Sequence, residues 1–249
     1  MDTRPVPEVS QLLDRHFRWR GREVSRLEGF SDAVFAIVLA LLFLRAAPPE
    51  TFADLKATMK GLVPFAATFA IVAWIWYQHW LFSRRYALRD GWTTFLNLLL
   101  LFLLLFYAYS LKFLFTLVFV SLTGPIGTLT HAHMLQGFVG ERDGVALFLF
   151  YGFGYGSIFA TLALMHWRAL RLTDYLQLDR VERFLTRMAI VQSATQIAIA
   201  VMSCTLAATG IGLDIGLPGW IYGTIGPLMA ILGTWQGRKM EQLLAARVS

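Results

Sequence analysis

The sequence predicts an all-α integral membrane protein, and three observations support this prediction. Of the 249 residues, 57% are hydrophobic and only 15% are charged, whereas a soluble domain carries about 25% charged residues. Apolar runs long enough to cross a bilayer recur along the whole chain. Lysine and arginine are concentrated in the segments that separate alternate runs.

The apolar runs predict six transmembrane helices joined by short connectors. A helix needs about 20 apolar residues to span the hydrocarbon layer, so six helices leave no room for a separate soluble domain of ordinary size. We therefore divide the chain into a basic N-terminal segment (1–29), a transmembrane domain (30–235) and a C-terminal tail (236–249). The six predicted spans are 30–46, 62–83, 92–115, 145–167, 187–209 and 217–235.

The distribution of positive charge predicts that both termini are cytoplasmic. Seventeen of the 22 lysines and arginines lie in four segments: the N-terminal segment, 84–91, 168–187 and the tail. Positive loops stay on the cytoplasmic side, and an even number of spans returns the chain to that side. The first 29 residues are polar and lack the apolar core of a secretory signal. The net charge of +6 therefore reports topology and lipid contact, and no nucleic-acid partner is expected.

Two connectors are predicted on the outer side. Pro48 and Pro49 end the first span, and residues 50–60 are typical of a short amphipathic helix. The longer connector, 116–144, is rich in glycine and turn residues, which predicts a loop.

Three polar side chains are predicted at one depth, near the cytoplasmic edge of the membrane. Asp32, His79 and Asn97 lie on the first three spans, and polar groups inside a membrane usually face protein or water. We expect a hydrogen-bonded network that joins these helices, with Ser31 and either Trp76 or Trp80 as further partners. Arg26 is expected to offset the charge of Asp32. In a second interpretation, Ser31 and Asp32 only cap a helix and His79 reaches the interface.

Beyond Asp32 the first span has no polar side chain. Ile37, Leu41 and Leu44 follow one another at i, i+4 and i+7, so they form a stripe on one face, with Ala40 beside it. Such a stripe is typical of helix packing or lipid contact.

Residues 26–32 match the R-x-x-x-F-S-D signature of the transmembrane protein 175 family, and the chain resembles its prokaryotic members. Further matches are Trp76-x-x-His79 with Phe82 and the pair Arg84-Arg85, and Asn97 in the apolar run that opens the third span. The resemblance covers about residues 22–105. The last three spans resemble the family only in the number of spans and in their hydrophobicity.

The resemblance implies a homotetramer of six-span subunits that conducts potassium through a central pore lined by the first helix. It places a hydrophobic constriction at Ile37, with Leu41 and Leu44 as further apolar rings. It implies that a polar scaffold holds the pore helix in place without coordinating the ion; its residues are Arg26, Phe30, Ser31, Asp32, Trp76, His79 and Asn97. Potassium ions and membrane lipids are the implied partners.

The conductance expected from these residues is leak-like. No span carries an arginine ladder, so a voltage sensor of the usual kind is not expected. Ala40 offers no hydroxyl to an ion in the neck, which predicts modest selectivity for potassium over sodium. We expect no cofactor, and we place the protein in the plasma membrane of a prokaryote.

Other motifs carry less weight. Gly154-Tyr155-Gly156 resembles part of a potassium-channel filter but lies inside a predicted span, where small residues more often serve close helix packing. His131 and His133 form at most half of a metal site, so no metal is predicted. The single cysteine, Cys204, excludes an internal disulfide. No enzymatic constellation is found, because no histidine follows His166 to pair with a serine nucleophile.

The alternative function is a proton-coupled secondary transporter in which Asp32 and His79 titrate. Both residues are intramembrane candidates for proton transfer. The missing internal repeat and the missing broken-helix site at mid-membrane favour the channel instead.

Overall fold

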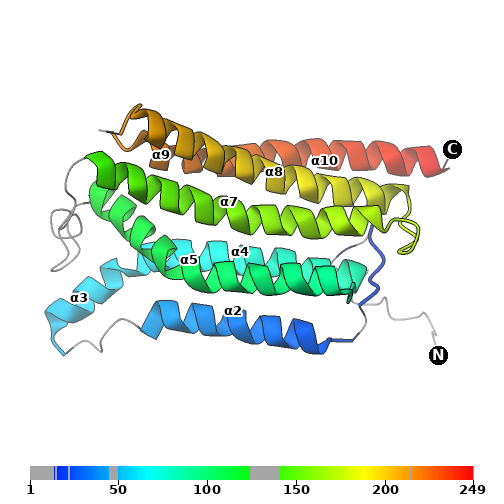
Figure 1. Ribbon diagram of the computed structural model, residues 1–249, viewed down its shortest axis with the longest axis horizontal. Coiled ribbons are helices and arrows are strands. Elements are labelled where there is room, and N and C mark those ends of the chain that lie inside the picture. Colours follow the sequence, from blue (N-terminus) through cyan, green and yellow to red (C-terminus); the bar gives the residue numbers. More distant parts are fainter. Residues whose placement is uncertain are drawn as a thin grey trace, which may run out of the picture.

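The computed structural model describes residues 14, 16–21, 23–44, 50–123, 141–213 and 215–248. The described part is helical (Figure 1). Its helices are α2 (Arg26–Leu44), α3 (Phe52–Lys60), α4 (Leu62–Tyr86), α5 (Gly91–Thr123), α7 (Glu141–Arg171), α8 (Arg180–Thr209), α9 (Leu217–Trp220), the 3₁₀ turn η1 (Ile221–Thr224) and α10 (Ile225–Val248).

Several helices begin at capping residues that are visible in the sequence. In α8 the Asp179 side chain accepts a hydrogen bond from the Glu182 amide, and Glu182 accepts one from the Asp179 amide. Ser25 and Glu28 exchange the same pair of bonds at the start of α2. Such reciprocal bonds satisfy amides that have no partner inside the helix. Helices α8 and α2 therefore each start at a residue that the capping bonds define.

The long helices lie side by side as an elongated bundle (Figure 1). Helices α7 and α8 make the most extensive contact, α5 packs on α7, and α4 packs on α5. Helix α2 lies at one edge of the bundle, where it packs on α4 and α5. Helix α10 packs on α8 at the opposite edge. One side of α2 is therefore left without a neighbour among the described elements of a single chain.

The basic segments that set the predicted topology gather at one end of the bundle (Figure 1). The start of α2, the α4–α5 turn, the α7–α8 turn and the end of α10 all lie there. We call this the basic end. The opposite end holds α3, α9 and the end of α2.

The core between the helices is apolar and closely packed. Its largest fully buried side chains include Phe35, Ile75, Leu104 and Phe159, which come from α2, α4, α5 and α7. Gly154 on α7 makes room for Tyr107 on α5, because a Cβ atom there would lie 2.1 Å from the tyrosine ring. The Gly-Tyr-Gly motif thus lies within a continuous helix and serves close packing. This is the role that the sequence analysis favoured over a selectivity filter.

The observed helices follow the predicted spans with different ends. The amphipathic segment 50–60 contains α3, and the third span continues as α5 to Thr123. The sixth span does not start as one continuous α-helix: α9 and η1 precede α10, and α10 runs on through the predicted tail to Val248. His131 and His133 lie outside the described residues.

Within the described residues, four helical stretches are long and apolar enough to cross a membrane: Phe52–Tyr86, Gly91–Val120, Arg142–Arg171 and Arg180–Thr209. Helices α2 and α10, which correspond to the first and sixth predicted spans, are not among them. The multi-pass character is therefore supported, and the total of six spans stays a prediction.

Candidate functional site

A buried network of polar side chains joins α2, α4 and α5 near the basic end. The Asn97 Nδ2 atom donates to Ser31 Oγ at 2.9 Å, and Ser31 Oγ donates to the Leu27 carbonyl at 2.8 Å. His79 Nε2 lies 2.5 Å from Asn97 Oδ1. Ser31, His79 and Asn97 are each at most 2% exposed. The structure thus brings together His79 and Asn97, two of the three residues predicted at one depth, with Ser31, which was expected as a further partner.

Asp32 takes a separate partner. Its Oδ1 atom accepts a hydrogen bond of 2.8 Å from Trp76 Nε1, so Trp76 fills the role for which Trp76 and Trp80 were both candidates. Trp80 stacks on Trp76 with ring centroids 6.4 Å apart. Asp32 and His79 therefore contact different side chains. Arg26 is exposed, and the described residues of one chain show no ion pair between it and Asp32.

The face of α2 opposite this network is apolar and exposed. Phe30 and Ile37 are each 53% exposed and Leu41 is 37% exposed. Ala40, beside them, is also exposed. On the packed face, Val34, Phe35, Val38 and Leu42 are buried. Ile37 and Leu41 thus lie on the side of α2 that faces away from the packed core, while the Leu44 side chain lies outside the described residues.

The far end of α2 is also fixed by a polar contact. Lys112 on α5 donates to the Leu42 carbonyl at 2.5 Å. Carbonyls in the last turn of a helix have no partner inside it, and a cation there interacts favourably with the helix dipole. Helix α2 is therefore held by hydrogen bonds at both ends.

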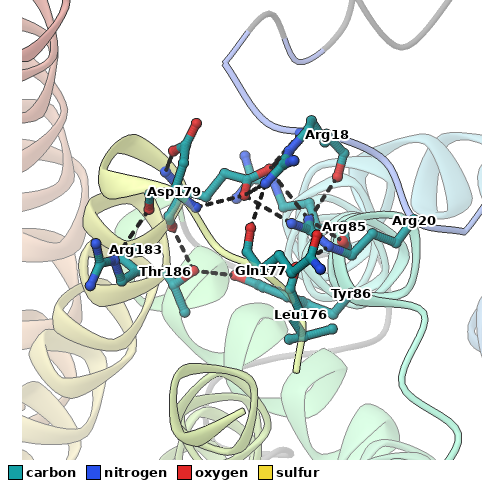
Figure 2. A network of polar contacts seen from close by, with 10 residues as sticks. Arg18, Arg20, Arg85, Tyr86, Leu176, Gln177, Asp179, Arg183 and Thr186 are labelled. Atoms are coloured by element: carbon teal, nitrogen blue, oxygen red, sulfur yellow. Dashed lines mark hydrogen bonds and ion pairs between the residues drawn. The ribbon is translucent and has the colours of Figure 1, made fainter. Parts of the chain in front are cut away.

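A second polar cluster lies at the basic end and ties the segment before α2 to the start of α8 (Figure 2). We call residues 16–21 the strap. Arg18 and Arg20 both pair with Glu182, at 3.0 and 2.9 Å. Glu182 is 1% exposed, so its carboxylate is buried beneath two guanidinium groups. Arg20 also donates to the Leu176 carbonyl at 2.9 Å.

The strap also contacts the end of α4. Arg84 Nη1 donates to the Gly21 carbonyl at 3.1 Å, and Arg20 Nη1 donates to the Arg85 carbonyl at 3.2 Å. A Cβ atom on Gly21 would lie 2.8 Å from the Ser83 carbonyl oxygen, so only glycine fits this approach. Arg84 in turn pairs with Glu28 of α2 at 3.2 Å. A series of polar contacts thus connects α8 to the strap, the strap to the end of α4, and the end of α4 to α2.

Two charged groups outside the spans have shifted pKa values. The hydrogen bond to Glu182, together with the charge of that carboxylate, raises the pKa of Arg18 further above its ordinary value. Burial alone would raise the pKa of Asp90 in the α4–α5 turn, but hydrogen bonds from Thr93 and the nearby Arg168 guanidinium lower that pKa overall. Both groups therefore stay ionised at neutral pH.

Sequence reasoning missed Glu182, Arg18 and Arg20. The signal that marks the site is the pattern Asp179-x-x-Glu182, a capping box immediately after a turn. Nothing in the local sequence links that capping box to Arg18 and Arg20, which lie 164 and 162 positions before Glu182. The contact forms only when the helices pack. The bond from Lys112 to the Leu42 carbonyl of α2 was not predicted either.

Comparisons with known proteins agree with the motif at the start of α2. The model of the family "Endosomal/lysosomal potassium channel TMEM175" matches residues 26–107, the part of the chain that contains the polar network and the exposed stripe. A protein of Marivirga tractuosa described as "Potassium channel" is 35% identical over 244 residues, which cover 97% of this chain and 99% of the relative.

This chain belongs to the TMEM175 family. The resemblance inferred from residues 26–32 is therefore confirmed. A crystal structure of a variant of the potassium channel MtTMEM175, in complex with a nanobody–MBP fusion protein, matches with a TM-score of 0.77 and 35% identity. The match covers 91% of this chain and 99% of that one. The TMEM175 family is one of potassium channels and not of enzymes.

Proposed function

We propose that this chain is a subunit of a homotetrameric, leak-like potassium channel in a prokaryotic plasma membrane, and that α2 lines its pore. The relatives described as potassium channels support the ion. The tetramer supplies four copies of α2 around one axis. Gating by a voltage sensor is not part of the proposal.

The observation that carries the proposal is the two-sided environment of α2. Ser31, Asp32 and the Leu42 carbonyl fix the helix to α4 and α5, while Ile37 on the other face is 53% exposed. A helix held this firmly on one face presents its other face at a fixed position. That position suits a pore axis, where small displacements of the helix change the pore radius.

The proposed constriction is a hydrophobic neck formed by Ile37, with Leu41 and Leu44 beyond it. Four branched aliphatic side chains around an axis exclude water when they touch, and such a neck gates by dewetting. Potassium passes only when the neck is wide enough to hydrate. Ala40 supplies no oxygen to an ion there, so the expected preference over sodium is modest.

Potassium flux into liposomes that contain the purified protein tests this function. Wild type is compared with Ile37→Asn, and Ile231→Asn is the matched control. Ile231 is another exposed isoleucine, 63% exposed on α10 against 53% for Ile37, and receives the same substitution. We expect a polar side chain at position 37 to hydrate the neck and raise the flux, while the change at position 231 leaves it near wild type.

Equal fluxes in the two variants would show that Ile37 does not line the pathway. No flux from any folded protein would reject the constitutive channel and favour the proton-coupled transporter. That alternative predicts loss of activity in Asp32→Asn and indifference to Ile37. In the structure Asp32 and His79 have different partners, Trp76 and Asn97, and this separation favours the channel.

A further inference from the structure

A small cavity at the basic end is lined by two residues that each have a buried acceptor atom with no hydrogen bond from the described residues. It has a volume of about 30 Å³ and lies between the start of α2, the end of α4 and the start of α5. A site of this size holds about one or two water molecules. His79 and Glu28 both line it, and they are 2% and 5% exposed.

The hydrogen bonds of the network determine which nitrogen of His79 carries the proton. Ser31 Oγ gives its proton to the Leu27 carbonyl, so it accepts from Asn97 Nδ2. The remaining polar atom of Asn97 is its Oδ1, which only accepts. His79 Nε2 must therefore be the donor of their 2.5 Å contact. A neutral imidazole has one N–H group, so Nδ1 carries a lone pair.

His79 Nδ1 receives no hydrogen bond from the described residues. The same holds for Glu28 Oε1, although that atom forms an ion pair of 3.2 Å with Arg84 Nη2. A buried acceptor without a hydrogen bond is costly, and His79 and Glu28 each have one such atom. A water molecule carries the two donors that such a pair requires.

The cavity is reached from the basic end. Glu23, before α2, and Arg89, in the α4–α5 turn, are both exposed and form part of its lining. Solvent on that side of the membrane therefore has access to the interior of the network.

We propose that this cavity is a hydration site and that His79 exchanges its proton with the solution at the basic end through Nδ1. Protonation at Nδ1 leaves the bond from Nε2 to Asn97 intact. The added proton turns Nδ1 into a donor beside a cavity that Glu28 also lines. The new positive charge then lies inside the network that fixes α2.

The charged groups around His79 come from several elements. Glu28 and Asp32 belong to α2, Glu23 precedes it, Arg84 belongs to α4, and Arg89 belongs to the turn. Helices α5 and α7 contribute only neutral side chains to the lining: Thr93, Asn97 and Met165. Of the side chains around this cavity, only histidine in its unperturbed form changes charge between about pH 5 and 8, so His79 is the group that acidification of the basic end is expected to protonate.

Nitrogen-15 NMR of histidine-labelled protein in lipid nanodiscs tests the site without any assumption about conduction. His79→Gln identifies the His79 signals. We expect a neutral ring that is protonated at Nε2, bare at Nδ1, and in exchange with water. A neutral ring with its proton on Nδ1, or a ring shielded from water, would overturn the hydration site.

The consequence for conduction rests on the proposed function and is measured as potassium current in excised membrane patches. In wild type we expect loss of current when the face at the basic end is acidified and not when the other face is. In His79→Gln the current should be the same with the basic end acidified as at neutral pH, whatever the basal current of that variant. His166→Gln is the control, because His166 is buried on α7, bonds to the Leu162 carbonyl and is not part of the cavity lining.

A wild-type pH response that persists in His79→Gln would reject His79 as the proton acceptor. If wild type carries no potassium current at all, the channel proposal fails, and the NMR result decides the hydration site alone.

Discussion

At the scale of the residue, Asn97 is the centre of the network because its side chain both donates and accepts. Its amide joins Ser31 on α2 to His79 on α4. A hydroxyl or carboxylate at this position fails to reproduce both bonds with the same geometry. The only asparagine in the chain thus links three helices.

We expect Asn97→Leu to lower the free energy of unfolding by about 2–4 kcal/mol, because it leaves the buried His79 N–H and the Ser31 hydroxyl with unmade bonds. Thermal unfolding in detergent measures the loss. The control is Gln192→Leu, which removes a half-buried amide whose only side-chain hydrogen bond among the described residues is to Gln236 at 3.2 Å and should cost less than about 1 kcal/mol. Equal losses in the two variants would contradict a central role for Asn97.

At the scale of the element, the strap connects the start of α8 to the start of α2. Both of its ion pairs are with one carboxylate, Glu182, which is buried at the first turn of α8. Tyr86 of α4 reaches the next turn of α8: Thr186 donates to the Glu182 carbonyl, so Tyr86 donates to Thr186 at 2.7 Å. Movement of the basic end of α2 is therefore coupled to α4 and α8.

Glu182→Gln should destabilise the protein by about 3 kcal/mol, because removing one partner leaves Arg20 close to a neutral, poorly matched group. Glu241→Gln is the matched control, since Glu241 is exposed on α10. Chemical unfolding followed by tryptophan fluorescence measures both. A Glu182 variant as stable as the Glu241 variant would show that the strap contributes nothing to stability.

The packing of α5 on α7 depends on a single glycine. Gly154→Ala places a methyl group 2.1 Å from the Tyr107 ring, so we expect a loss of about 1–3 kcal/mol from overpacking. At Gly226 on α10, a Cβ atom has no neighbour within 4 Å. Gly226→Ala should therefore be neutral or slightly stabilising. The difference in melting temperature between the two variants is the measurement, and no difference would argue against close α5–α7 packing.

At the scale of the whole molecule, the bundle has one basic end and wide apolar surfaces. Large exposed apolar side chains lie on several helices, among them Phe102, Phe153, Val201 and Ile231. In water such a surface would be costly, but in a bilayer it faces lipid. The molecule is therefore organised for a membrane environment.

The predicted topology is tested by cysteine labelling in a Cys204→Ala background. Thr51→Cys lies just before α3 at the end opposite the basic end, and Glu241→Cys lies on the last turns of α10. We expect a membrane-impermeant maleimide to label the Thr51 variant on intact cells and the Glu241 variant only after the inner face is exposed. The reverse pattern would place the basic end outside.

Much of this protein is determined by its sequence alone. Apolar runs fix the helices because no other backbone form satisfies its hydrogen bonds in lipid, and the arginine distribution predicts the orientation. The motif Arg26 to Asp32, with His79 and Asn97, identified the family and the helices that meet. The ends of α5 and α10 were predicted less well, because helical structure continues beyond the apolar window that the sequence reveals.

Only the tertiary structure decided which side chains bond to one another. Both Trp76 and Trp80 suited Asp32 by spacing, and the packing of α4 on α2 selected Trp76. Three features depend on side chains far apart in sequence. They are the hydrogen bond from His79 to Asn97, the His79 Nδ1 acceptor that receives no hydrogen bond, and the pairing of Arg18 and Arg20 with Glu182. Their geometry is set by how the helices pack, and local sequence carries no record of that packing.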